Sequence, residues 1–182
     1  MANNELKNRL LTKVTNYFTP INFMLISPIL LCEDTISMST INYVVTNYAQ
    51  EFSSYIRHDD ETIYIHRSYK NKLLRYKKTL FDPFCRTTKF PFYYEENKYI
   101  ITTVGQLNFY MWALEIGLIE FIRNNYNNII FNMKKNGKTG SESMQNSIST
   151  GSTTFDSEIS SSEKIKYSNK IIYSKPMTLD IF

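Results

Sequence analysis

The stretch that most constrains the fold is residues 98–126, with the sequence KYIITTVGQLNFYMWALEIGLIEFIRNNY. After its β-branched start, apolar residues recur at helical spacing and leave almost no polar face. They form two stripes on different sides of the expected helix, one made of Val104, Leu107, Met111, Leu114 and Leu118 and the other of Phe109, Trp112, Ala113, Ile116 and Ile119. A helix with two apolar faces needs packing partners on both sides. The stretch therefore predicts a buried central helix, with a hairpin against one face and N-terminal helices against the other.

The start of this helix is marked by Thr103 and Gln106. Threonine followed three residues later by glutamine is a capping box, in which both side chains satisfy N–H groups of the helix start. Just before it, residues 90–103 contain two aromatic and β-branched runs separated by Glu95, Glu96, Asn97 and Lys98. This pattern predicts an antiparallel hairpin with a four-residue turn. The central helix is thus expected to begin directly after the hairpin.

Two further helices are expected in the N-terminal half. Residues 5–18 carry apolar side chains at spacings of three and four, which predicts a helix that Pro20 ends. Residues 39–56 repeat apolar side chains in the same way, with Ser39 or Thr40 available as the N-cap. The chain therefore has helical material to cover one face of the central helix.

Two shorter segments complete the expected core. Residues 62–66, TIYIH, predict a short strand. Residues 23–31, FMLISPILL, form the longest apolar run, but they are nine residues with a central proline. A bilayer-spanning helix needs about 20 residues. The run is therefore expected in the core, and no membrane partner is predicted.

These elements place the chain in the α+β class, with N-terminal helices and a small antiparallel sheet packed around one central apolar helix. Residues 1–138 are expected to form a single globular domain, because 42% hydrophobic and 15% aromatic residues suffice for one core. Between 140 and 163, twelve of twenty-four residues are Ser or Thr, so residues 139–166 are predicted to be a flexible linker. Residues 167–182 are predicted to be a C-terminal strand that returns to the sheet edge, because Met177, Leu179 and Ile181 alternate.

The basic segment 67–89, RSYKNKLLRYKKTLFDPFCRTTK, is the feature that bears most on function. It holds eight Lys or Arg against one Asp, a local net charge of +7, whereas the whole chain carries +4. Donors for phosphates and rings for stacking alternate in it. The candidate nucleic-acid-binding residues are Arg67, Tyr69, Lys70, Lys72, Arg75, Tyr76, Lys77, Lys78, Arg86 and Lys89.

Leu73 and Leu74 are expected to anchor this segment to the core as a helix. Lys134, Lys135 and Lys138 would extend the basic surface if the central helix ended nearby. Two other interpretations stay open: a basic face that is merely solvated, and a basic face that meets an acidic protein surface.

Metal and catalytic chemistry find little support in the sequence. Cys32, Cys85, His58 and His66 lack the short spacings of zinc modules, and nothing local marks either cysteine as an activated nucleophile. The run 58–61, HDDE, is interpreted as a solvated turn, with a divalent-cation site or a metal-dependent activity as the alternative. Five glycines in all leave no glycine-rich phosphate loop. A non-enzymatic protein with no catalytic residue, metal or cofactor is therefore expected.

The two cysteines, Cys32 and Cys85, are far apart and form no Cys-x-x-Cys, which is typical of a reducing compartment. Residues 1–18 contain acids and bases and lack the apolar core of a signal peptide. The protein is expected in the cytoplasm or nucleus and is not expected to be secreted. The sequence favours no particular oligomeric state.

Two motifs carry a resemblance to a known family. The turn 81-FDPFCR-86 and the segment 102-TTVGQLNFYMW-112, followed by an Asn-Asn-Tyr helix end, resemble a family of largely uncharacterised proteins of nucleocytoplasmic large DNA viruses such as mimivirus. The resemblance covers residues 79–130 and implies a viral protein of the host cytoplasm or nucleus, or of the virion. Family members often carry a second basic cluster before their last strand, whereas this chain has its Ser/Thr-rich segment there.

The FDPFCR motif also has a physical interpretation of its own. Asp82 and Pro83 favour a turn, Phe81 and Phe84 are expected to staple it, and Arg86 to tie it down. A hairpin that leads through a Thr-containing segment into a Trp-bearing helix is also similar to KilA-N viral DNA-binding modules, at the level of fold analogy. The leading hypothesis is a non-enzymatic viral protein that contacts the nucleic-acid phosphate backbone. The alternative is a protein-interaction or virion-associated adaptor without a nucleic-acid ligand.

Overall fold

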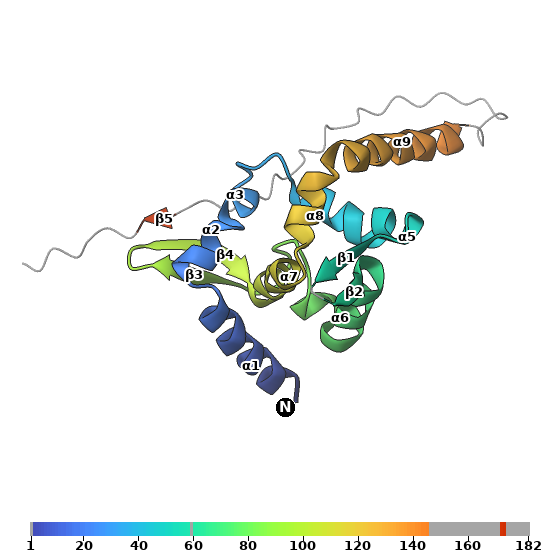
Figure 1. Cartoon of the computed structure of the whole chain (residues 1–182). Coiled ribbons are helices and arrows are strands. Elements are labelled where there is room, and N and C mark those ends of the chain that lie inside the picture. The colour runs from blue at the N-terminus through green and yellow to red at the C-terminus, as the bar shows by residue number, and fades with distance from the viewer. Residues whose placement is uncertain (1, 59, 146–171, 174–182) are drawn as a thin grey trace, which may run out of the picture.

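The computed structural model describes residues 2–58, 60–145 and 172–173 (Figure 1). Its helices are α1 (Ala2–Tyr17), α2 (Pro20–Met24), α3 (Ser27–Leu30), α4 (Met38–Tyr43), α5 (Ala49–Glu51), α6 (Ile65–Leu80), α7 (Val104–Glu115), α8 (Leu118–Asn124) and α9 (Tyr126–Gln145), with a π-helical segment, η1 (Val44–Tyr48), between α4 and α5. Its strands are β1 (Tyr55–His58), β2 (Glu61–Tyr64), β3 (Lys89–Glu95), β4 (Lys98–Thr103) and β5 (Ile172–Tyr173).

Two small antiparallel sheets lie among these helices. β1 pairs with β2, and β3, β4 and β5 form a second sheet in that order. Helices and strands are interleaved along the chain without a parallel crossover in the described sheets. The predicted α+β class is confirmed.

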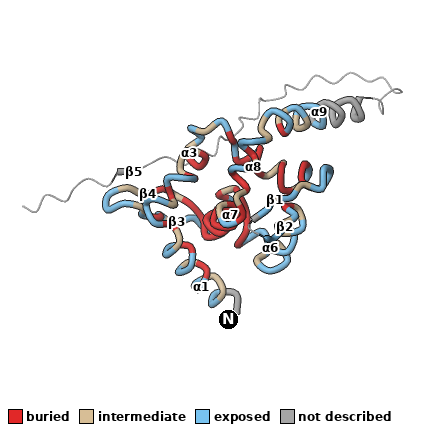
Figure 2. Tube along the Cα trace, in the orientation of Figure 1, coloured by how far each residue is buried: buried red, intermediate tan, exposed pale blue. Residues whose placement is uncertain are grey.

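Helix α7 is the centre of the molecule. Every residue from Val104 to Ala113 is buried, and Figure 2 shows this helix in red with other elements around it. It packs against α1, α6 and β4, and Thr103 Oγ1 accepts a hydrogen bond from Gln106 N at 3.1 Å as the N-cap. The predicted central helix and its threonine cap are confirmed.

The prediction of one helix through Tyr126 is wrong. Gly117 has a φ of +73°, in the left-handed region that glycine adopts without steric cost, so α7 ends at Glu115 and α8 begins at Leu118. The two apolar stripes predicted for one helix are therefore divided between α7 and α8.

Helix α6 is held against α7 by an aromatic cluster. Trp112 of α7 is 1% exposed, and its Nε1 donates a hydrogen bond to Ser68 Oγ of α6 at 3.1 Å. Its ring also lies 6.2 Å from the Tyr69 ring and 5.3 Å from the Phe81 ring, measured between centroids. These contacts fix which side of α6 faces the core.

The hairpin of β3 and β4 is confirmed, but its turn is shorter than predicted. The strands stay paired as far as Glu95 and Lys98, so only Glu96 and Asn97 remain between them. Beyond β4, Ile172 and Tyr173 of β5 pair with Tyr99 and Lys98. The rest of the predicted C-terminal strand lies outside the described residues.

Residues 38–51 are helical through α4, η1 and α5, which shifts both ends of the helix predicted over 39–56. The N-cap is Ser37, whose Oγ accepts from Thr40 N at 3.0 Å, in place of Ser39 or Thr40. Helix α1 is found as predicted, and Pro20 begins α2 directly after it. The run 23–31 is divided between α2 and α3, and it buries Phe23, Ile26, Ile29 and Leu30.

Two predicted boundaries lie elsewhere in the structure. The strand expected over 62–66 is β2, which ends at Tyr64 because α6 begins at Ile65. Helix α9 runs to Gln145, past the domain end expected at residue 138. The helix thus enters the first part of the predicted linker, and residues 146–166 lie outside the described ranges.

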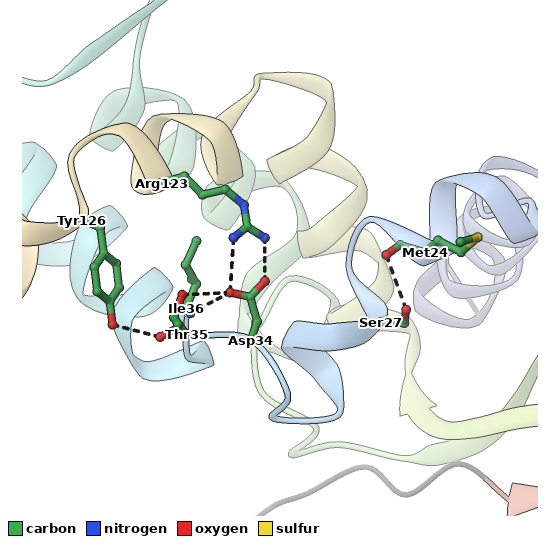
Figure 3. A network of polar contacts seen from close by, with 7 residues as sticks. All are labelled: Met24, Ser27, Asp34, Thr35, Ile36, Arg123 and Tyr126. Carbon is green, nitrogen blue, oxygen red and sulfur yellow. Dashed lines mark hydrogen bonds and ion pairs between the residues drawn. The ribbon is translucent and has the colours of Figure 1, made fainter.

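A polar network ties the loop after α3 to α8 and α9 (Figure 3). Arg123 Nη2 of α8 contacts Asp34 Oδ2 at 2.5 Å, and the same carboxylate accepts from Ile36 N at 2.9 Å. Tyr126 of α9 donates to Thr35 O at 3.0 Å. The loop is therefore held to the C-terminal helices.

Within the described ranges, no helix combines the length and apolarity that crossing a bilayer requires.

Candidate nucleic-acid interface

Helix α6 carries most of the predicted basic residues and has two distinct sides. Its inner side buries Ile65, Tyr69 and Leu80. Its outer side exposes Arg67, Lys70, Leu74 and Arg75. Residues three, four and seven apart share a face of a helix, so Arg67, Lys70 and Leu74 lie in one row with Arg75 beside it. The outer surface of α6 is thus basic, with an apolar side chain inside the basic row.

Leu74 is 82% exposed, so the prediction that it anchors the helix is wrong. Leu73 does contact the core cluster, as predicted. The difference follows from helical geometry, because adjacent residues lie about 100° apart around the helix.

The end of α6 changes direction at Lys77. This residue has φ +55° and ψ +171°, a conformation that non-glycine residues rarely adopt. Lys77 and Lys78 are both exposed. Lys78 therefore does not follow the row of the preceding turns.

The two predicted stacking residues have different positions. Tyr69 is 5% exposed and packs against Phe81 and Trp112, so its ring is not presented to a base. Tyr76 is half-buried and stacks on Phe81 with 25° between the ring planes. The Arg75 guanidinium carbon lies 5.3 Å from the Tyr76 ring centroid. Neither tyrosine is an open stacking platform.

Lys72 faces the junction of α6 with α1 and α7. Partial burial lowers the pKa of Lys72, the Glu115 carboxylate counteracts this, and the charges of Lys13 and Arg75 lower the pKa further. Lys13 Nζ of α1 lies 3.8 Å from Glu115 Oε1 of α7. Glu115 therefore lies among these cations and partly neutralises them.

Two lysines of α1 lie beside α6 and were not predicted from the sequence. One is Lys13, and the other is Lys7, which lines a cavity of about 190 Å³ together with Thr79, Leu80 and Thr87. Their charges were visible in the sequence, but no pattern placed α1 next to the end of α6. They bring additional positive charge to this side of the molecule.

Arg86 forms an ion pair within the FDPFCR turn. Its Nε donates to Asp82 Oδ2 at 2.8 Å and its Nη2 to Asp82 Oδ1 at 2.7 Å. The guanidinium also lies 4.8 Å from the Phe84 ring centroid. The predicted role of Arg86 in tying the turn is confirmed, and the Asp82 carboxylate offsets its charge.

The FDPFCR turn is docked on the start of α7. Asp82 N donates to Gly105 O at 3.1 Å, Gln106 Nε2 donates to Pro83 O at 3.0 Å, and Asn108 Nδ2 donates to Leu80 O at 2.7 Å. Lys89, the last predicted site residue, is exposed at the first position of β3. The turn thus separates Arg86 and Lys89 from the regular part of α6.

The lysines of α9 do not extend this surface. Figure 1 shows α9 and α6 on opposite sides of α5. Lys134 and Lys135 are exposed on α9, while the side chain of Lys138 lies outside the described part. The structure therefore does not bring Lys134 and Lys135 to α6.

The thiols and imidazoles remain dispersed. Cys85 is buried, and burial raises the pKa of its thiol. His66 Nδ1 lies 2.8 Å from Val45 O. Among the residues whose side chains are described, no three His, Cys, Asp or Glu side chains are grouped to hold a metal ion.

Helix α6 thus carries five exposed cations: Arg67, Lys70, Arg75, Lys77 and Lys78. Within the described residues, the ion pairs of the structure involve none of the five. Unpaired surface cations attract anions without first giving up a carboxylate partner. The arrangement is suited to contact a polyanion.

Comparisons with known proteins place the chain near a giant-virus protein. The profile of a family of unknown function (DUF7197) matches residues 4–179. An uncharacterised protein of Acanthamoeba polyphaga mimivirus is 34% identical over 126 residues, which are 64% of this chain and 49% of that protein. The chain thus spans about half the length of this curated relative. No solved structure gives a significant match.

Proposed function

This chain belongs to the family of unknown function DUF7197, and we propose that it is a non-enzymatic viral protein that binds the phosphate backbone of nucleic acid. The contact surface is the outer side of α6 together with Lys77 and Lys78 in its last turn. The observation that carries the proposal is the set of five exposed cations without an ion-pair partner among the described residues.

The chemistry of the proposed contact is electrostatic. Lys and Arg side chains that neutralise phosphates release condensed counterions, and this release drives sequence-independent binding. Lys7 and Lys13 of α1 add charge next to α6. Base stacking is not part of the proposal, because Tyr69 is in the core and Tyr76 is stacked on Phe81.

The test is fluorescence anisotropy of labelled duplex and single-stranded oligonucleotides with the full chain at two salt concentrations. Wild type is expected to bind near 50 mM salt and to weaken steeply as the salt concentration rises, with a slope set by about three to five phosphate contacts. The combined charge reversal Arg67→Glu, Lys70→Glu and Arg75→Glu is expected to abolish binding.

The single reversal Lys70→Glu has a charge-matched control in Lys134→Glu, which changes an exposed lysine of α9 on the other side of α5 (Figure 1). Lys134→Glu changes the net charge of the protein but leaves the α6 surface intact, so binding should remain close to that of wild type. The proposal fails if the protein does not bind at about 50 mM salt, or if the reversal on α6 and a charge-matched reversal elsewhere have equal effects.

A second candidate function is an adaptor that binds an acidic protein surface. Leu74 supports it, because this side chain is 82% exposed within the basic row and phosphates make no use of an apolar group. Leu74→Ser separates the two candidates. It should leave oligonucleotide binding unchanged, whereas it should weaken a protein partner that remains bound to the chain after nuclease treatment.

A further inference from the structure

A small polar cavity lies between the α4–η1 helix and the FDPFCR turn. Its volume is about 160 Å³, and its polar and charged lining residues include Asn42, Thr46, Lys78, Asp82 and Arg86. The remaining lining is aromatic and includes Tyr69. Segments far apart in the sequence therefore contribute to one enclosure, which is separate from the outer row of α6.

Three unusual local features meet at this cavity. Thr46 belongs to η1, a π-helical segment, and such segments occur frequently at functional sites. Lys78 follows Lys77, whose left-handed backbone is uncommon for a residue with a side chain. Asp82 and Arg86 form the bidentate pair of the FDPFCR turn. The backbone departs from regular α-helix at Lys77 and in η1. These two segments supply the lining residues Lys78 and Thr46.

The charges around the cavity favour an anion. Lys78 and Arg86 are cationic, and Asp82 is the one acid among the lining residues. Both carboxylate oxygens of Asp82 already accept hydrogen bonds from Arg86. The lining residues thus have a net charge of +1, and the Asp82 carboxylate is already occupied by its hydrogen bonds with Arg86.

Tyr69 supports this description of the cavity. Burial raises the pKa of the Tyr69 phenol, the Asp82 carboxylate raises it further, and the Arg86 guanidinium counteracts the rise. The phenol therefore interacts electrostatically with the ion pair and stays protonated at neutral pH. The cavity is thus lined by two neutral hydrogen-bond donors, the Tyr69 hydroxyl and the Asn42 side-chain amide.

We propose that this cavity binds a phosphate group. Its volume is below the roughly 300–1,000 Å³ of pockets that take a whole drug-sized ligand, so a nucleoside does not fit with the phosphate. It exceeds the space of a single water. A phosphate oxygen accepts hydrogen bonds from ammonium, phenol and amide donors, and Lys78 supplies the charge that no described carboxylate neutralises.

Two sources can supply the same phosphate group: free inorganic phosphate and the terminal phosphate of a nucleic acid. A terminal phosphate can enter a small, partly open cavity, whereas an internal phosphodiester carries a nucleoside on each side. The inference does not rest on binding to the outer side of α6, because phosphate occupancy is measured without an oligonucleotide.

The experiment is a titration of the full-length, ¹⁵N-labelled protein with inorganic phosphate, followed by amide NMR spectra at constant ionic strength. Saturable shifts are expected at Thr46, Lys78 and Arg86. Lys78→Gln should weaken phosphate binding about tenfold or more, the effect of losing one charge-assisted hydrogen bond. Lys134→Gln is the matched control, since Lys134 is an exposed lysine of α9 that does not line the cavity.

A second variant, Asn42→Ala, removes an amide donor without changing the charge and is also expected to weaken phosphate binding. Absence of saturable shifts up to roughly 10 mM phosphate would overturn the inference. So would equal affinities of Lys78→Gln and Lys134→Gln for phosphate.

A competition arm identifies the source of the phosphate. A 5′-phosphorylated oligonucleotide that displaces phosphate more strongly than its 5′-hydroxyl counterpart supports a terminal phosphate as the ligand. Equal competition supports free phosphate. The triple reversal Arg67→Glu, Lys70→Glu and Arg75→Glu should preserve the cavity shifts, so failure of the α6 proposal and failure of this one give different results.

Discussion

Arg123 and Asp34, 89 positions apart in the chain, form a two-contact ion pair in which Asp34 is nearly buried and Arg123 is half exposed. Burial alone raises the pKa of Asp34, but hydrogen bonds from Arg123 and from the Ile36 N–H, together with the Arg123 charge, lower it below its ordinary value. The pair connects the loop after α3 to α8, so it contributes to the stability of the fold in a pH-dependent way.

Asp34→Asn is expected to lower the free energy of unfolding by about 1–2 kcal/mol at neutral pH, because it removes a charge-assisted pair and leaves Arg123 without its carboxylate. The folded-state pKa of Asp34 is depressed, so its stabilisation is complete above the unfolded-state pKa of about 4 and is lost as the pH falls through the folded-state pKa. The difference between wild type and variant should therefore shrink below about pH 4.

Urea unfolding at several pH values measures this difference. Glu33→Gln is the control, because Glu33 is an exposed neighbour and undergoes the same acid-to-amide change. A difference between wild type and Asp34→Asn that stays constant into acid would contradict the assignment.

Tyr69→Phe is expected to leave oligonucleotide affinity unchanged. The Tyr69 ring packs between Phe81 and Trp112 and is 5% exposed, so it does not reach a base. Arg67→Ala, which changes an exposed residue of the same helix, should weaken binding because it removes a phosphate contact. Anisotropy titrations of both variants check this, and a selective loss of affinity in Tyr69→Phe would show that the Tyr69 hydroxyl takes part in binding.

Leu73→Ala and Leu74→Ala form a second matched pair. Leu73 contacts the core, so its truncation should cost about 1–2 kcal/mol of unfolding free energy. Leu74 is 82% exposed, and its truncation should stay within about 0.5 kcal/mol of wild type. Thermal unfolding of the two variants measures the contrast, and similar losses would place Leu74 in a contact that the structure lacks.

The two described glycines at the ends of α7 predict different responses to substitution. A Cβ at Gly105 would lie 3.0 Å from Thr79 O and 3.2 Å from Leu80 C, both backbone atoms of α6. Gly105→Ala should therefore push α6 from α7 and cost about 1–3 kcal/mol. Around Gly117 there is no atom within 4 Å of an added Cβ, so Gly117→Ala should cost only the left-handed backbone strain, about 1 kcal/mol.

Asparagine distinguishes these two causes, because it tolerates the left-handed conformation better than alanine. Gly117→Asn should recover part of the loss of Gly117→Ala, whereas Gly105→Asn should be at least as destabilised as Gly105→Ala. Chemical unfolding of the four variants gives the comparison. The steric explanation fails if asparagine restores stability at Gly105.

The sequence predicted those parts of the fold that depend on local patterns. The apolar periodicity around Leu107 and the Thr103 cap indicated a buried helix and its start, because burial and capping leave a local signature. The end of α7 was missed, since Gly117 lies within an unbroken apolar pattern and only its φ of +73° shows the break. The N-cap at Ser37 was missed because neighbouring Ser and Thr residues offered equally good caps.

The candidate site was predictable in its charge but not in its partners. The count of cations in residues 67–89 stands, but pairing of Arg86 with Asp82 and the position of Glu115 near Lys72 depend on packing between elements. The inward position of Tyr69 follows from its place on the buried side of α6, a side that charge alone did not define. The approach of Lys7 to Thr79 has no sequence signal at all.

The position of Trp112 gives this protein an internal optical reporter. The sequence has one tryptophan, and its indole donates to Ser68 on α6 while being shielded from water. Tryptophan fluorescence therefore comes from one position, next to the buried side of α6. The opposite, exposed side of α6 is the surface proposed to bind nucleic acid. A ligand that binds the exposed side of α6 without moving the helix should leave the emission wavelength of Trp112 unchanged. A ligand that moves α6 away from α7 should expose Trp112 to water and shift its emission to longer wavelength.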